Sequence, residues 1–236
     1  MARQDGRQVR WNEHNQQRRM QILQAACDVI ETSPIGTDVH VQQIAEKAGL
    51  NRTVVYRHFA DRGDLDRAIR SHILDGVVAD LTPTISLEGS VNGIIRRIVQ
   101  TYVDYVVEHP ALHAYAVVDS AGSMDAGIDR IARSVAEVLE MAIGLLDAEL
   151  DEAEEQLVDP LAHGLVGAVF GAVRRWATRE PRQPGADRMA DLLTMSIWNL
   201  LDGHARRLGV DIDPDLPLVE LLALSQELDK PEDASA

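Results

Sequence analysis

The chain has 236 residues, of which 45% are apolar and only 4% aromatic. Ala, Leu, Ile and Val supply most of the apolar side chains, a composition that suffices for a packed core and favours helices over disorder. Cys27 is the only cysteine, which excludes an intrachain disulfide and the usual thiolate zinc sites. A reducing, cytoplasmic location is therefore expected. No uncharged run approaches the about 20 residues that a membrane helix needs, so no membrane partner is expected.

The charge of the chain is unevenly distributed. Its formal net charge is −15, which taken alone argues against binding to nucleic acid. Residues 1–72, however, contain 11 basic and 9 acidic residues, whereas the remainder contains 12 basic and 29 acidic residues. Because attraction to phosphate is screened beyond about 8 Å at physiological salt, the local balance matters more than the total. Only the N-terminal part is therefore suited to approach DNA.

The first 31 residues predict an arm followed by a helix. Residues 1–14 lack apolar periodicity and carry three arginines, which predicts a flexible basic arm. From residue 15 to residue 31, apolar side chains recur at helical spacing and predict an amphipathic helix. Pro34 and Gly36 end this pattern.

Two short helices joined by a tight turn are predicted at 41–48 and 52–59. Apolar residues at positions i, i+3, i+4 and i+7 form a core stripe in the first of them. Gly49 stands where a helix ends in a left-handed residue, and Asn51 is a good N-cap for the second helix. These proportions are those of a helix-turn-helix, in which the second helix enters the DNA major groove.

The predicted helix 52–59 has a buried face and an exposed face when its residues are placed at about 100° intervals. Val55 and Phe59 point toward the core with Leu50, whereas Thr53 and Arg57 point roughly the opposite way. The outward side chains are a guanidinium at the helix N-terminus and a mixed polar and apolar set behind it: Arg52, Thr53, Val54, Tyr56 and Arg57. Such groups can contact base edges, the thymine methyl group and phosphate oxygens.

The rest of the chain predicts long helices with short breaks, and no β-alternation or internal repeat. A fourth helix begins at Asp61 or Asp64 and continues to about Leu81, and further helices follow at 91–108, 111–118, 126–149, 159–178 (with Asp159 as its cap) and 186–208, with a short one at 219–228. The fold class is therefore all-α. The predicted domains are the arm 1–14, a helix-turn-helix domain 15–63, and a domain 64–236 that is joined without a flexible linker.

The segment from Val41 to Phe59, VQQIAEKAGLNRTVVYRHF, followed by Arg62, Asp64 and Leu65, resembles the signature of the TetR (tetracycline-repressor-type) family. The resemblance covers about residues 18–65, and beyond residue 72 it extends to the helix count only. It implies that five side chains face bases, namely Gln42, Arg52, Thr53, Val54 and Arg57. It also implies that Tyr56, His58 and Arg62 contact the DNA backbone. His40 replaces the usual Ser or Thr at the cap of the second helix, which weakens that cap.

The resemblance further implies a homodimer formed by the last two long helices. Small residues cluster on one side of helix 159–178, where each glycine costs up to about 1 kcal/mol, and they would permit close approach of a second helix. The predicted interface residues are Gly164, Gly167, Ala168 and Gly171 of this helix with Leu193, Ile197, Leu200 and Leu201 of the next. Packing within the chain is the alternative explanation for the same residues.

The helices at 91–149 are then expected to enclose a cavity for a small, mostly apolar effector with a polar handle. The candidate lining residues are aromatic, imidazole and thioether side chains: Tyr102, Tyr105, His109, His113, Tyr115, Met124, Met141, Phe170 and Trp176. An ordinary role in the core is the alternative for each of them. No cofactor is expected.

These features together predict a ligand-responsive regulator that acts as a repressor and binds palindromic operator DNA, and two other functional classes are alternatives to it. An enzyme lacks support, because the chain has no Glu-x-x-His pair for a di-iron site, no G-x-S-x-G nucleophile motif and no P-loop. A DNA-binding protein without a ligand is the closer alternative. The large non-basic helical region after residue 72 argues against it.

Overall fold

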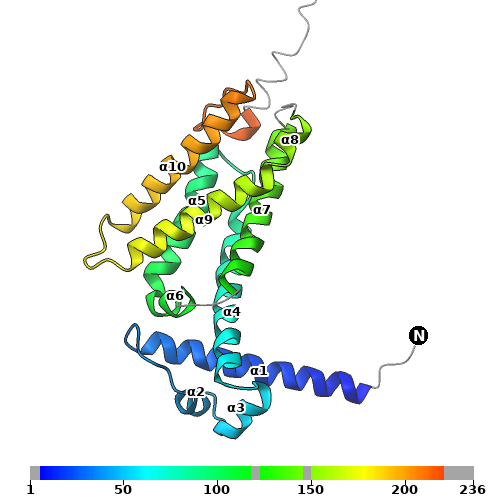
Figure 1. Cartoon of the computed structure of the whole chain (residues 1–236), viewed down its shortest axis with the longest axis vertical. Coiled ribbons are helices and arrows are strands. Elements are labelled where there is room, and N and C mark those ends of the chain that lie inside the picture. The colour runs from blue at the N-terminus through cyan, green and yellow to red at the C-terminus, as the bar shows by residue number, and fades with distance from the viewer. Residues whose placement is uncertain (1–5, 118–122, 146–149, 221–236) are drawn as a thin grey trace, which may run out of the picture. The chain divides into compact units, whose positions relative to one another are not determined.

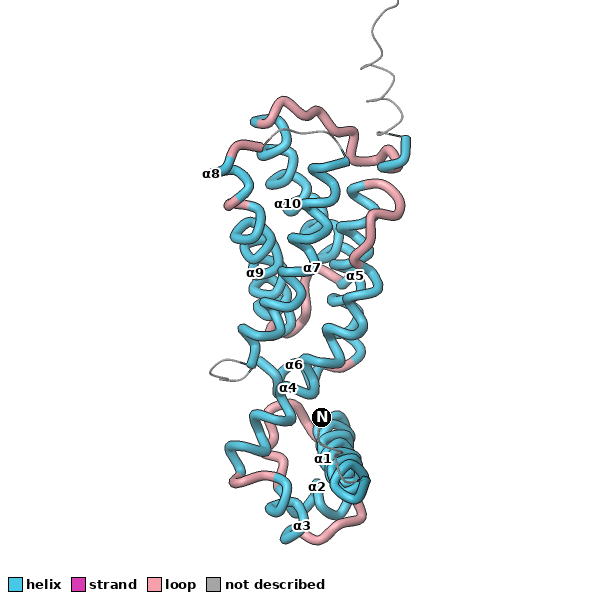
Figure 2. Tube along the Cα trace, turned by 90° about the vertical axis from the view of Figure 1, so that its right-hand side faces the viewer, coloured by secondary structure: helices cyan, strands magenta, loops and turns pink. Residues whose placement is uncertain are grey.

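The computed structural model describes residues 6–117, 123–145 and 150–220, and within these ranges every regular element is a helix (Figures 1 and 2). The helices are α1 (Gly6–Thr32), α2 (Val41–Lys47), α3 (Arg52–His58), α4 (Arg62–Leu81), the 3₁₀ turn η1 (Thr82–Thr84), α5 (Val91–Glu108), α6 (Pro110–Val117), α7 (Ser123–Leu145), α8 (Glu152–Glu155), α9 (Val158–Ala177) and α10 (Ala186–Arg207). The predicted all-α fold is confirmed. The end of the predicted helix 126–149 and most of the predicted helix 219–228 lie outside the described residues.

Three of the predicted local features are wrong. Helix α1 begins at Gly6, so residues 6–14, which were assigned to a flexible arm, are helical despite their lack of apolar periodicity. Helix α9 begins at Val158 with Leu157 as its N-cap, which makes Asp159 a residue of the first turn rather than the cap. The short helix α8 was not predicted; Asp151 caps it, and its side chain accepts a hydrogen bond from the Glu154 amide at 2.9 Å.

The chain forms two compact units. The N-terminal unit comprises Met1–Gly76 and Glu108–Asp125, and the C-terminal unit comprises Val77–Val107 and Ala126–Ala236. This division differs from the boundary at residue 63 that the sequence suggested. Helix α4 contributes residues to both units, and α6 belongs with the N-terminal helices although it follows α5 in the chain.

The N-terminal unit has a core of aliphatic side chains from α1 to α4 and one aromatic ring. Ile22, Ile44, Val55 and Leu65 are fully buried, and Phe59 is only 2% exposed. Gly49 ends the segment after α2 with a φ of +66°, a left-handed conformation that glycine adopts without steric cost. The chain can therefore turn sharply between α2 and α3, as the sequence predicted.

Helix α6 is attached to α4 by a partly buried polar network. The Tyr115 hydroxyl donates to the Asp66 carboxylate at 2.6 Å, and the Arg62 Nε donates to both oxygens of the same carboxylate at 2.9 Å. The Arg70 guanidinium lies over the Tyr115 ring, 5.4 Å from its centroid. Burial raises the pKa of the Tyr115 hydroxyl above its ordinary value, and the bond to Asp66 raises it further, so Tyr115 remains a donor.

The C-terminal unit is built from α5, α7, α9 and α10, which bury their apolar faces against one another (Figure 1). The Tyr102 ring on α5 stacks on the Phe170 ring of α9 with centroids 4.3 Å apart. After α10, the chain returns to the start of α5, where the Leu218 amide donates to the Gly89 carbonyl at 3.0 Å. No helix in the described part of the chain is long and apolar enough to cross a membrane.

Removal of the Tyr115 hydroxyl is expected to destabilise the N-terminal unit by about 1.5–3 kcal/mol, because Asp66 loses a charge-assisted bond in a partly buried site. Urea unfolding of Tyr115→Phe, Asp66→Asn and the double variant measures the coupling between the two side chains. A coupling energy near zero would show that the hydrogen bond between Tyr115 and Asp66 does not stabilise the unit.

Candidate nucleic-acid interface and ligand cavity

The first residues of α3 and the Arg57 side chain form an exposed, cationic face. Arg52, Thr53 and Arg57 are exposed and Val54 is partly exposed, whereas Val55 on the opposite side is fully buried. The Asn51 side chain caps the helix by accepting a hydrogen bond from the Thr53 amide at 2.9 Å, which confirms the predicted N-cap. The Val54 amide donates to the Asn51 carbonyl at 2.8 Å, so Asn51 satisfies two amides of the first turn.

A cation–π contact orients the first arginine of α3. The Arg52 guanidinium lies 5.5 Å from the centroid of the Tyr56 ring, one turn further along the helix. This contact restricts the long Arg52 side chain without occupying its five N–H donors, which remain available for a base edge or a phosphate. Tyr56 is partly buried and also packs against the core of the N-terminal unit.

Helix α1 holds α3 in place through two residues whose role the sequence did not indicate. The Arg19 Nη1 donates to the His58 carbonyl at 2.7 Å, at the end of α3, and its guanidinium lies 4.2 Å from the Phe59 ring centroid. The Gln21 amide donates to the Ala48 carbonyl at the end of α2, at 2.8 Å. These bonds fix the ends of both short helices against α1. A basic residue on a helix gives no sign in sequence of which distant carbonyl it contacts.

Two other predicted DNA contacts have side-chain partners within the chain, and a third is a histidine with a lowered pKa. Gln42 is exposed, and its amide donates to Glu46 at 2.7 Å. The Arg62 guanidinium is paired with Asp66, so it must share or exchange this partner to bind a phosphate. Burial lowers the pKa of His58, and the nearby charges of Arg18 and Arg19 lower it further, so a neutral imidazole is favoured at neutral pH. The roles of these residues in DNA binding stay predictions.

The cap of α2 differs from the usual one in the way the sequence indicated. His40 is the N-cap residue, and the Gln43 side chain accepts a hydrogen bond from the His40 amide at 2.7 Å. Gln43 therefore supplies the reciprocal bond of a capping box from within the first turn. This bond compensates in part for the absence of Ser or Thr at position 40.

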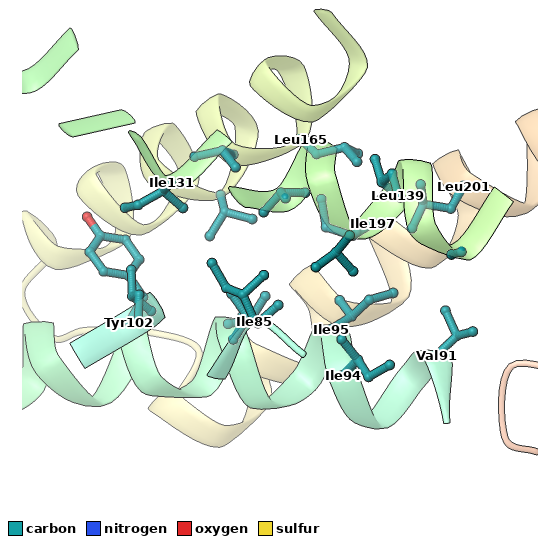
Figure 3. A pocket seen from close by; sticks show the side chains of 18 of the residues that line it. Ile85, Val91, Ile94, Ile95, Tyr102, Ile131, Leu139, Leu165, Ile197 and Leu201 are labelled. Carbon is teal, nitrogen blue, oxygen red and sulfur yellow. The ribbon is translucent and has the colours of Figure 1, made fainter. Parts of the chain in front are cut away.

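The C-terminal unit encloses an apolar cavity of about 150 Å³ between α5, α7, α9 and α10, which we call the inner cavity (Figure 3). Aliphatic side chains form its wall except at Tyr102 and Phe170, and no charged side chain is among its described lining residues. In Figure 3, Tyr102 lies at one end of the lining, and Val91 and Leu201 lie at the other. Leu81, the last residue of α4, also lines this cavity.

Only Tyr102 and Phe170 of the predicted ligand contacts line this cavity. The Tyr115 hydroxyl and His109 are bonded to Asp66 and Glu31 in the N-terminal unit, where His113 is also buried. The others contact other groups, are exposed or do not line the cavity: Trp176, whose indole donates to the Pro184 carbonyl at 2.7 Å, Met141, which is 52% exposed, and Tyr105. The Met124 side chain lies outside the described residues. Aromatic, imidazole and thioether side chains were thus poor candidates for the lining, because aliphatic residues form most of the cavity wall.

A second cavity of about 230 Å³, the outer cavity, adjoins the first. The two cavities share five lining residues from α5, α7, α10 and the segment after it: Val91, Leu139, Ala142, Leu201 and Leu218. Unlike the inner cavity, the outer one has charged or titratable groups in its wall, contributed by Glu154, His204 and Arg207.

The exposed sides of α9 and α10 carry some of the predicted interface residues. Gly164, Ala168 and Gly171 are exposed along one face of α9, and a side chain added at either glycine would meet nothing within 4 Å. On α10, Met195 and Leu200 are 54% and 49% exposed. The assignment of Leu193 and Ile197 to this surface is wrong for the chain taken singly, because both are buried within the unit. Ile197 and Leu201 line the inner cavity instead, and Gly167 is partly buried.

Comparison with curated proteins identifies regulators of transcription, while no family model matches the chain. The chain is 28% identical over 202 residues to the uncharacterized HTH-type transcriptional regulator Rv0472c of Mycobacterium tuberculosis, and the match covers 84% of this chain and 83% of the relative. It is 33% identical over 86 residues to the HTH-type transcriptional repressor LfrR of Mycolicibacterium smegmatis, covering 36% of this chain and 44% of LfrR.

Solved structures have the same fold. A TetR-like transcriptional regulator from Rhodococcus sp. RHA1 superposes with a TM-score of 0.54 at 24% identity, covering 79% of this chain and 96% of that protein. The complex of RolR with resorcinol superposes with a TM-score of 0.61 at 12% identity, covering 87% and 99%. The Rhodococcus protein and the two curated relatives are transcriptional regulators, in agreement with the expectation from the sequence.

Proposed function

We propose that this chain, which by fold and sequence similarity is a transcriptional regulator of the TetR type, acts as a homodimeric repressor that a small apolar effector releases from operator DNA. The observation that carries the proposal is the exposed face of α3. There, Arg52, Thr53 and Arg57 are free of the core, while Val55 and Phe59 hold the opposite side of the helix.

The side chains of this face are suited to direct readout in the major groove. Arginine can donate two hydrogen bonds to guanine O6 and N7, and the Thr53 hydroxyl and methyl group can contact a base edge or the thymine methyl group. The Tyr56 hydroxyl and the His58 imidazole lie further along the same helix and can donate to phosphates. Such contacts fix the position of the protein on the DNA but not its sequence preference. Arg62 serves as a further phosphate contact, shared with Asp66.

A dimer requires a surface that one chain leaves uncovered, and the exposed sides of α9 and α10 meet this condition. Three glycines in the interior of α9 each destabilise the helix relative to alanine, so their presence needs compensation. Close approach of a second copy of α9 and α10 supplies it, with Met195 and Leu200 buried at the contact. The dimer axis then relates two reading helices, which match two inverted half-sites about one helical turn or somewhat more apart.

The effector occupies the inner cavity, and α4 transmits the effect of its binding to the N-terminal unit. Leu65 and Ile69 of α4 are in the core of the N-terminal unit, and Leu81 of the same helix lines the cavity. A molecule that displaces Leu81 therefore acts on a helix whose other residues share a core with Val55 and Phe59. RolR, a structural neighbour, was crystallised with resorcinol, which supports a ligand in this fold. The direction of the response, release rather than tighter binding, is part of the proposal.

Substitution of Arg52 or Arg57 by Ala is expected to weaken operator binding by about 1–3 kcal/mol and to relax the preference at individual base pairs. Arg67→Ala is the matched control, because Arg67 is an exposed arginine of α4 outside the α3 face. Fluorescence anisotropy on selected and scrambled DNA measures both effects. Equal losses on the two DNAs would remove Arg52 and Arg57 from the base-reading residues.

Introduction of a carboxylate at the proposed interface, Gly171→Glu, is expected to convert the dimer into a monomer and to abolish operator binding without unfolding the chain. The side chain enters open space in the single chain but would place two like charges together across the dimer. Gly144→Glu, at an exposed helical glycine of α7, is the control. Sedimentation equilibrium measures the mass, and a Gly171→Glu variant that stays dimeric would contradict the interface.

A small hydrocarbon such as benzene is expected to bind the inner cavity and to lower operator affinity by about 5- to 150-fold, the usual range of allosteric coupling. Linkage requires that saturating operator DNA weaken the hydrocarbon by the same factor. Isothermal titration with and without operator measures both sides of this cycle. Identical hydrocarbon affinity in the two titrations would make the protein a DNA binder that does not respond to the ligand.

A further inference from the structure

We infer that the inner and outer cavities form one elongated site for a long-chain carboxylate, whose hydrocarbon tail fills the inner cavity and whose carboxylate contacts Arg207 and His204. This inference rests on the proposed ligand response and specifies the chemical class of the ligand. It departs from the sequence-based expectation of an effector whose polar handle meets aromatic and imidazole groups in the cavity wall.

The wall of the inner cavity selects for hydrocarbon. Apart from Tyr102 it consists of side chains without any hydrogen-bonding group, so a polar ligand atom placed there would lose its bonds to water without replacement. Such a loss costs about 5- to 150-fold in affinity for each unsatisfied group. Burial also raises the pKa of the Tyr102 hydroxyl, which marks the surroundings of that end as strongly desolvating. A methyl terminus suits this end better than any polar head.

The size of the two cavities requires a chain rather than a compact molecule. An apolar protein cavity of about 150 Å³ holds one benzene molecule, which is the volume of the inner cavity alone. With the outer cavity of about 230 Å³ the total is roughly two and a half times larger, enough for a chain of about 12–16 carbons. The five shared residues lie between the cavities, at the end of the inner one that is opposite Tyr102, as Figure 3 shows for Val91 and Leu201. A ligand that occupies both cavities must therefore be an extended chain.

The polar groups are confined to the outer cavity, where they favour an anionic head. The Glu154 carboxylate there already accepts a hydrogen bond from the Asp151 amide at 3.0 Å in the cap of α8. The side chains of Arg207 and His204 have no hydrogen bond or ion pair with any residue in the described ranges, whereas the neighbouring Arg206 is paired with Asp202 at 2.9 Å. A carboxylate can accept from both the guanidinium and the imidazole.

Isothermal titration with saturated fatty acids below their micellar concentrations tests the length of the site. Each methylene buried adds about fourfold in affinity, so dodecanoate should bind about 100-fold or more tightly than octanoate, with no further gain beyond about 16 carbons. Dodecanoate should also bind more tightly than 1-dodecanol and dodecyltrimethylammonium. Affinity that is independent of chain length, or that is highest for the trimethylammonium head, would overturn the inference.

Two variants with matched controls test the two ends. Arg207→Gln should weaken dodecanoate about tenfold and leave 1-dodecanol unchanged, whereas Arg206→Gln should change neither. Ala142→Phe fills the junction and should abolish dodecanoate binding while benzene still enters the inner cavity; Met141→Phe, at an exposed neighbour, is its control. Equal effects of the two arginine variants, or dodecanoate binding that survives Ala142→Phe, would contradict the site.

Binding and DNA release are measured separately, so the two proposals can fail independently. If dodecanoate binds with these dependences but leaves operator affinity unchanged, the site stands and the ligand response fails. If benzene releases operator while dodecanoate does not bind, the ligand response stands and the inference is wrong. Thermal unfolding of each variant confirms that the chain remains folded.

Discussion

The burial of Val55 and Phe59 is the constraint on which the DNA-facing surface depends. A helix of seven residues is marginal by itself, so α3 exists because one of its faces is held in the core of the N-terminal unit. The burial of these two side chains fixes the rotation of the helix about its axis. Arg52, Thr53 and Arg57 are exposed as a consequence, because they occupy the remaining positions of a 3.6-residue period.

The same core also explains why residues far from α3 matter for its position. Arg19 packs on the Phe59 ring and bonds the last carbonyl of α3, while Gln21 bonds the last residues of α2. Carbonyls at the ends of helices lack partners within the helix, so a side chain from α1 satisfies them. Asp66 has a comparable role for α4 and α6, since its carboxylate accepts hydrogen bonds from both Arg62 and Tyr115. The predicted DNA contacts therefore lie on helices that partly buried polar bonds hold in place.

The C-terminal unit has an apolar interior with two adjoining cavities, and it also has an exposed apolar surface on α9 and α10. Apart from the Tyr102 hydroxyl, the described lining of its inner cavity has no group that could bind a polar molecule, whereas the adjoining outer cavity has an arginine and a histidine whose side chains have no partner within the described residues. The exposed glycines of α9 and the exposed Met195 and Leu200 of α10 form a surface of a different kind, which is open to another helix. One unit can thus serve a ligand and a second copy of the chain through different faces of the same helices.

The sequence by itself determined the local features of this protein. Periodicity, the Asn51 cap and the left-handed Gly49 depend on neighbours within a few residues, so the helix-turn-helix and most helix bounds could be predicted closely. The start of α1 was missed because residues 6–14 lack the apolar stripe on which the prediction relied. Tertiary structure alone decided which side chains meet. Tyr115 bonds Asp66 across 49 residues, and Leu193 and Ile197 are buried within their own unit, while aliphatic residues rather than the predicted polar and aromatic ones line the cavity. Side-chain chemistry is readable from a sequence, but the partner that each buried group finds depends on packing between helices that are distant in the chain.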